Sequence, residues 1–164
     1  MKVMVLGVGN ILLSDEGLGV HAVNQLKRNC SFGDDLQLLD GGTLGIDLLY
    51  YMEGVDKLLI IDAVLGGGPP GTLYLLKDHE VKSHFRKKVS AHEVGVQEVL
   101  ALAELTGKKP AEIVLIGMEP FSFEVSTDLS DPVKEKMPEL LMAVIEQLKN
   151  WGVEVRCHGD HHLG

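Results

Sequence analysis

The amino-acid sequence predicts an α/β domain of three layers, in which a mostly parallel, twisted sheet lies between two layers of helices. Short apolar runs alternate along the chain with longer segments in which apolar residues recur at helical spacing. The run 57–61 is apolar after its first residue, which is typical of a strand buried on both faces of a parallel sheet. Strands and helices that alternate in this way build layered α/β domains.

Each element is expected from a local pattern. Strands are expected at 3–6, 36–39, 57–61, 72–76 (at an edge of the sheet) and 113–116, with a last short strand at 153–155. Helices are expected at 15–28, 45–52, 92–105 and 132–149, where apolar residues recur on one helical face. Asp131 is the expected N-cap of the last helix. Residues 66–71 read Gly-Gly-Gly-Pro-Pro-Gly and predict a loop.

The length of 164 residues is enough for one ordinary domain. We assign residues 1–156 to a single α/β domain and residues 157–164 to a His-rich tail, interpreted as a polar terminus that binds metal only opportunistically. The two cysteines, Cys30 and Cys157, are too few for a disulfide framework, and the chain contains no Cys-x-x-Cys motif.

Charge and hydropathy exclude several classes of function. The formal net charge is −9, whereas a nucleic-acid-binding protein needs a basic face. A cation, or a partner with a basic segment, fits this charge better. No continuous apolar stretch approaches the roughly 20 residues that span a membrane, and the N-terminus lacks the pattern of a signal peptide. We therefore expect a cytoplasmic protein that binds neither nucleic acid nor membrane.

Acidic residues stand at the ends of three expected strands. Asp15 and Glu16 follow the first strand, Asp40 ends the second and Asp62 ends the third. In a parallel sheet, the carboxyl ends of neighbouring strands meet at one edge, where ligands bind. His92 begins a later helix and can reach the same edge. Two carboxylates and one imidazole suit a divalent metal ion such as nickel, zinc or manganese.

Simpler structural interpretations of these residues also remain open. Asp15 can serve as a helix N-cap, Asp40 can begin the glycine turn that follows it, and His92 can be an ordinary residue at a helix start. Gly7-Val8-Gly9 does not continue into a dinucleotide-binding motif, because its third glycine position is Leu12. The two glycines are better explained by a tight turn after the first strand.

Several motifs, in order, resemble those of the maturation endopeptidases of nickel-iron hydrogenases. The matching segments are Leu6-Gly7-Val8-Gly9-Asn10, Asp15-Glu16-Gly17-Leu18-Gly19-Val20, Asp40-Gly41-Gly42-Thr43, Asp62 and Ser90-Ala91-His92. The resemblance extends over nearly the whole chain and agrees with the length of the family. The tail after Val155 contains no motif of the family.

The resemblance implies an activity and a set of site residues. Members of the family remove a short C-terminal peptide from the precursor of the hydrogenase large subunit, and nickel already bound in the precursor is the recognition signal. The metal-contacting positions of the family correspond to Glu16, Asp62 and His92, which are also expected to act in catalysis. Asp40 matches a position linked to nickel recognition and cleavage. The implied cofactor is therefore nickel supplied by the precursor, with no organic cofactor, and the implied partner is that precursor, met by a monomer.

Two mechanisms and several other functions stay open at this point. The metal either polarises the scissile carbonyl or activates water, with Asp40 or Glu16 as base, or it only docks the precursor. Docking is slightly favoured. The chain contains no Gly-x-Ser-x-Gly nucleophile motif. A checkpoint or chaperone that binds nickel-loaded precursor without cutting it is therefore an alternative, as is a related peptidase with another protein substrate. A nucleotide-binding enzyme is the weakest alternative.

Overall fold

The computed structural model describes residues 1–41, 47–87 and 94–158 of the chain. Its centre is a five-stranded sheet with the strand order β3-β1-β4-β6-β5. The strands are β1 (Val3–Gly7), β3 (Leu36–Asp40), β4 (Lys57–Ala63), β5 (Leu73–Lys77) and β6 (Glu112–Met118). All neighbours in the sheet are parallel except β5, which runs antiparallel to β6 at one edge. The mostly parallel sheet and the edge position of β5 confirm the prediction.

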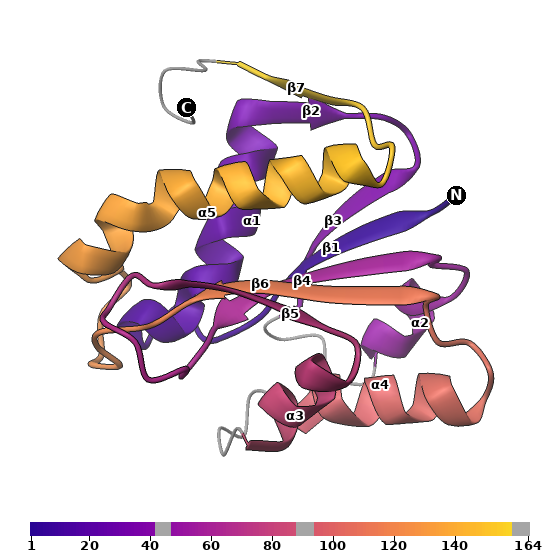
Figure 1. Cartoon of the computed structure of the whole chain (residues 1–164), viewed down its shortest axis with the longest axis horizontal. Helices are drawn as coiled ribbons and strands as arrows, with labels where there is room; N and C mark the ends of the chain where they lie inside the picture. The colour runs from indigo at the N-terminus through magenta and orange to yellow at the C-terminus, as the bar shows by residue number, and fades with distance from the viewer. Residues whose placement is uncertain (42–46, 88–93, 159–164) are drawn as a thin grey trace.

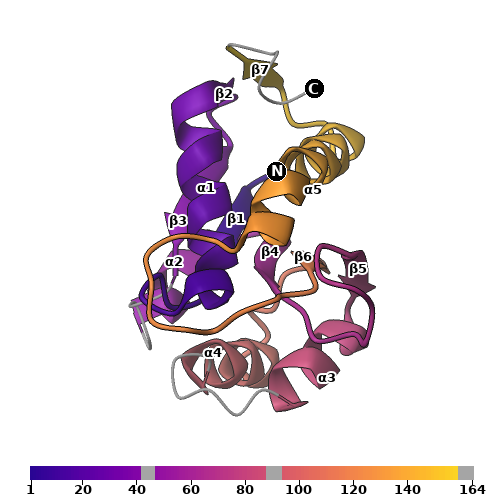
Figure 2. The same ribbon diagram turned by 90° about the vertical axis from the view of Figure 1, so that its left-hand side faces the viewer.

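Helices cover both faces of the sheet, so the three-layer α/β prediction is confirmed (Figures 1 and 2). One face carries α1 (Leu18–Asn29) and α5 (Asp131–Asn150), and the other carries α2 (Leu48–Met52), α3 (His79–Lys87) and α4 (Val94–Leu105). A short 3₁₀ helix, η1 (Ser14–Gly17), precedes α1. α3 was not predicted, although Val81 and Phe85, four residues apart, are its buried face.

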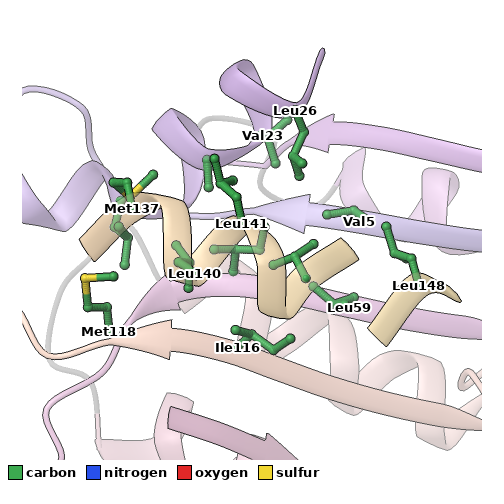
Figure 3. Close-up of a cluster of buried hydrophobic side chains, with 14 of the residues drawn as sticks. Val5, Val23, Leu26, Leu59, Ile116, Met118, Met137, Leu140, Leu141 and Leu148 are labelled. Carbon is green, nitrogen blue, oxygen red and sulfur yellow. The ribbon is translucent and has the colours of Figure 1, made fainter. Parts of the chain in front are cut away.

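Each face of the sheet has its own hydrophobic core. In Figure 3, the apolar face of α5 lies over side chains of β1, β4 and β6, with α1 beside it. The second core lies between the other face of the sheet and α2, α3 and α4. The strands β1, β4 and β6 contribute to both cores, which explains why their sequences are apolar without alternation.

The order of the strands predicts a ligand-binding crevice beside β1. The connection from β1 to β3 passes through α1 on one face, and the connection from β3 to β4 passes through α2 on the other face. The two connections therefore run to opposite faces of the sheet, and they diverge at the carboxyl ends of β1 and β4, which are hydrogen-bonded neighbours. In open α/β sheets, ligands bind where the connections diverge in this way.

A second, two-stranded sheet joins the segment after α1 to the segment after α5. β2 (Cys30–Phe32) pairs antiparallel with β7 (Val155–Cys157), and Cys30 is opposite Cys157. A disulfide joins these two cysteines. The sequence analysis did not predict this bond. Cys157, which it placed at the start of the tail, is the last residue of strand β7. Residues 159–164 lie outside the described residues.

Two boundaries differ from the prediction for identifiable reasons. Asp62 does not end its strand but lies inside β4, because its carboxylate finds partners within the fold. Asp131 is the first residue of α5 and not its N-cap. The N-cap is Ser130, whose hydroxyl donates to Asp15 instead of capping the helix.

Candidate functional site

Asp62 is fully buried at the carboxyl end of β4, and both of its carboxylate oxygens accept hydrogen bonds. The backbone N–H of Ala63 donates to Oδ1 at 2.9 Å. The Nε2 atom of His84, on α3, lies 2.8 Å from Oδ2. A buried carboxylate needs such partners, because removal from water disfavours its charged form.

Glu16 lies in η1, directly after the turn that leaves β1. Gly9 makes this turn possible: its φ is +119°, and a Cβ there would lie 1.8 Å from the carbonyl oxygen of Glu16. The predicted tight turn is therefore confirmed. Glu16 is only 6% exposed, and η1 lies against β4, the strand of Asp62.

A cavity of about 570 Å³ connects the surroundings of Glu16 with those of Asp62. Both Glu16 and His84 line it, and the imidazole of His84 contacts Asp62. Most of its wall is apolar, and the lining comes from η1, from the end of β4 and the segment after it, from β5, from α3 and from the loop after β6. The lining residues are Glu16, Ala63, Val64, Leu65, Gly66, Tyr74, Leu76, His79, Glu80, Ser83, His84, Lys87 and Phe123.

Asp15 fastens the loop between β6 and α5 beside this cavity. Its Oδ2 accepts hydrogen bonds from the N–H groups of Phe121 and Ser122, at 2.8 and 2.9 Å, and from the Ser130 hydroxyl at 2.7 Å. Its Oδ1 accepts the Ser130 N–H at 2.8 Å. Asp15 is completely buried and makes no side-chain N-cap contact, so the N-cap interpretation is wrong. The loop that it holds carries Phe123 into the cavity wall.

Another buried carboxylate, that of Glu119, holds the glycine-rich loop on the other side of the cavity. Its Oε1 accepts hydrogen bonds from the N–H groups of Gly66 and Gly68 and from the Tyr74 hydroxyl, the last at 2.7 Å. The hydrogen bond to Glu119 raises the pKa of the Tyr74 phenol above its ordinary value, since the neutral phenol is the donor. Glu119 and Asp15 thus each fix one loop of the cavity rim.

The remaining two predicted site residues are placed differently. Asp40 is exposed at the carboxyl end of β3. It pairs with Gly7 of β1, whose partner on the other side is Ile61, the residue before Asp62. Asp40 is therefore about two strand spacings from Asp62, on the order of 10 Å, and it does not line the cavity. His92 lies outside the described residues.

Within the described ranges, no group of three His, Cys, Asp or Glu residues is arranged to hold a metal ion. Glu16 lines the cavity together with His84, which the sequence analysis missed, and Asp62 contacts His84 without lining the cavity itself. His84 could have been found only by recognising helix α3 in the sequence. Val81 and Phe85 form the buried face of this helix, and His84, the residue before Phe85, lies at the edge of that face.

Comparison with known proteins assigns the chain to a family. The family model described as hydrogenase maturation protease matches residues 20–147. The Hydrogenase 2 maturation protease of Escherichia coli K12 is 39% identical over 155 residues, which cover 94% of this chain and 94% of that protein. The chain belongs to the hydrogenase maturation protease family. The resemblance inferred from the sequence motifs is thereby confirmed.

Other relatives agree with this membership. The hydrogenase expression/formation protein HupD of Bradyrhizobium diazoefficiens is 40% identical over 94% of this maturation protease and 81% of its own length. The solved structure of the hydrogenase maturating endopeptidase HybD from E. coli has a TM-score of 0.92 and 38% identity, covering 98% of this chain and 99% of that one. The chain therefore has the three-layer fold of this family and is a maturation protease like its other members. No helix in the described part of this maturation protease has the length and apolar character needed to cross a bilayer.

Proposed function

We propose that this maturation protease removes the C-terminal peptide from the nickel-loaded precursor of a nickel-iron hydrogenase large subunit, with the bound nickel as the recognition signal. Membership of the family supports the reaction and the class of substrate. The observation that carries the proposal is the cavity lined by Glu16, by Ala63 at the end of β4 and by His84, whose imidazole contacts the buried Asp62.

The donor atoms at this cavity suit the nickel carried by the precursor. Glu16 and Asp62 offer carboxylate oxygens, and we propose His92 as the nitrogen donor that completes the set. Imidazole and carboxylate ligands both bind divalent nickel. Nickel in the precursor brings ligands of its own, so three donors from the protease leave coordination positions for the substrate.

Exposed apolar side chains beside the cavity support a protein as substrate. Phe121, Phe123 and Val125 are 66%, 44% and 86% exposed on the loop after β6. Ile11 and Leu12, 43% and 57% exposed, lie on the adjoining loop, which pairs with the first through backbone hydrogen bonds of Ser126. Large exposed apolar groups that cluster beside a polar site are typical of surfaces that bind other proteins.

The experiment that tests the proposal is the intact mass of a cognate large-subunit precursor, nickel-loaded and nickel-free, after incubation with the protease. Loss of a C-terminal peptide from the loaded form alone is the expected result. Cleavage of both forms would overturn nickel recognition. Nickel-dependent co-elution without any loss of mass would favour the non-cleaving checkpoint.

The variant Asp40→Asn separates the two mechanisms. If Asp40 is the base that takes a proton from the attacking water, cleavage stops while nickel-dependent binding of the precursor persists. If the nickel only docks the precursor and the protease positions the scissile bond, Asp40→Asn weakens binding and cleavage together. Asp40 is exposed, so the asparagine variant is expected to fold and both readouts can be measured on it.

A further inference from the structure

The side chain of His84 is buried against the candidate site although it belongs to none of the motifs that identify the family. It is 7% exposed, and its Nε2 atom lies 2.8 Å from Oδ2 of Asp62, which is completely buried. An ionised carboxylate only accepts hydrogen bonds, so the imidazole is the donor in this contact. The Ala63 N–H holds the other oxygen, Oδ1.

These two contacts fix the carboxyl group of Asp62 in both position and plane. One donor comes from the backbone of its own strand and the other from helix α3, so rotation of the carboxyl group breaks one hydrogen bond or the other. A carboxylate has about four acceptor sites, so accepting these two hydrogen bonds is compatible with binding a cation.

The helix that carries His84 is itself firmly held. Val81 and Phe85 of α3 are completely or almost completely buried in the core of that face. Lys82, between them, forms an ion pair with Glu104 of α4. The imidazole is thus presented by a packed element and not by a loop, which is what the orientation of a site residue requires.

We infer that His84 is a positioning residue: it holds the Asp62 carboxylate in the orientation that receives the nickel of the precursor. This inference rests on the proposed function. Carboxylates that bind metals are themselves held by hydrogen bonds from neighbouring side chains, and loss of such a partner typically reduces metal affinity or activity by about 10–100-fold. A buried ion pair with no function would instead affect stability alone.

The test compares His84→Gln with His84→Leu. The amide nitrogen of glutamine can replace Nε2 as donor, whereas leucine fills similar space without a donor. Arg86→Gln is the matched control, since Arg86 is exposed on the same helix and does not line the cavity. Cleavage of nickel-loaded precursor gives kcat and KM, nickel-dependent co-elution gives binding, and circular dichroism shows that each variant is folded.

His84→Leu is expected to lower kcat/KM and nickel-dependent binding about 10–100-fold, while His84→Gln and Arg86→Gln stay within about threefold of the wild type. In an Asp62→Asn background, His84→Leu is expected to have little further effect, because residues that act through one another are not additive. A folded His84→Leu protein with wild-type kcat/KM and binding would overturn the inference. An equal loss in His84→Gln and His84→Leu would do so too.

A direct structural readout separates this inference from the proposed function. Crystal structures of the two variants are expected to show Asp62 in its wild-type orientation with glutamine at position 84 and turned away with leucine. An unchanged Asp62 in His84→Leu would overturn the positioning role, whatever the substrate proves to be. Failure of the wild-type protein to cleave or bind loaded precursor would instead overturn the proposed function.

Discussion

At the scale of single residues, buried carboxylates organise the rim of the cavity. Asp15 accepts hydrogen bonds from three backbone N–H groups and one hydroxyl, all from the loop between β6 and α5. Asp62 and Glu119 are likewise buried and accept hydrogen bonds from neighbouring segments. Each carboxylate therefore defines the conformation of a segment distant from it in the sequence.

The substitution Asp15→Asn tests this role. The amide places a donor where one carboxylate oxygen accepted hydrogen bonds, so at least one buried donor of the loop loses its acceptor. We expect a loss of about 3 kcal/mol in the free energy of unfolding, measured by urea denaturation. Asp131→Asn, at the exposed start of α5, is the control and should change this free energy by less than about 0.5 kcal/mol. Similar losses in the two variants would contradict the role of Asp15.

His21 is expected to make the stability of the fold depend on pH. Burial lowers the pKa of its imidazole below the ordinary value of 6.5, an effect opposed by the Thr127 backbone and the Asp128 carboxylate. Its Nε2 atom is buried with no hydrogen-bond partner among the described residues, so a proton there would meet no acceptor. Because the unfolded chain binds this proton more readily, the contribution of His21 to stability is intact above pH 6.5 and is lost as the pH falls from 6.5 through the lowered pKa.

The measurement is urea unfolding of the wild type and of His21→Gln at several pH values between 7.5 and 5. The wild type should lose stability more steeply than the variant as the pH falls, because glutamine does not titrate. Parallel pH profiles for the two proteins would show that His21 does not contribute this dependence.

At the scale of elements, close contact between α1 and the sheet places η1 over β4. The first turn of α1 approaches the backbone so closely that a Cβ on Gly19 would lie 2.0 Å from the carbonyl oxygen of Ile61 and 2.6 Å from the backbone of Val8. Only glycine fits at this crossing. Glu16, in the short helix directly before α1, owes its position against β4 to this approach.

The substitution Gly19→Ala is expected to push α1 and η1 away from the ends of β1 and β4. The free energy of unfolding should fall by about 3 kcal/mol, and cleavage of the precursor should fall with it because Glu16 moves. Gly33→Ala is a matched control: its added Cβ meets nothing closer than 3.8 Å, and its stability should stay near the wild-type value. A Gly19→Ala protein as stable as Gly33→Ala would refute the close packing.

The order of the main elements could be predicted from the sequence, but the partners of the site residues could not. Continuous apolar runs gave β1, β4 and β6, because strands buried on both faces need no alternation. α3 was missed because charged residues surround its two core residues, so its apolar periodicity is short. The contact of His84 with Asp62 spans 22 residues and depends on how α3 packs, which no local pattern encodes.

At the scale of the whole molecule, the disulfide between Cys30 and Cys157 joins the end of α1 to the strand after α5. The two cysteines are 127 residues apart in the sequence, so the bond closes most of the chain into one loop. Closure of a loop of this length restricts the unfolded chain and stabilises the folded state, in the chain-entropy model, by about 3–5 kcal/mol.

Reduction of this bond is expected to lower the free energy of unfolding by about 3–5 kcal/mol, measured by urea denaturation with and without dithiothreitol. The double variant Cys30→Ser/Cys157→Ser should have the lower stability and show no response to the reductant. A thiol assay of the native wild type should detect no free thiol. Equal stability of the wild type in both conditions would contradict a stabilising bond.

The same covalent loop determines what happens when the backbone is cut. The bond encloses β3, the glycine-rich segment, α3, α4 and all of α5. A single proteolytic cut anywhere between residues 30 and 157 therefore yields two fragments that remain one molecule. Such nicked protein would migrate as one species on a non-reducing gel and separate into two only after reduction. For an enzyme whose substrate is itself a polypeptide chain, this linkage means that an accidental internal cut opens a loop without releasing part of the cavity wall.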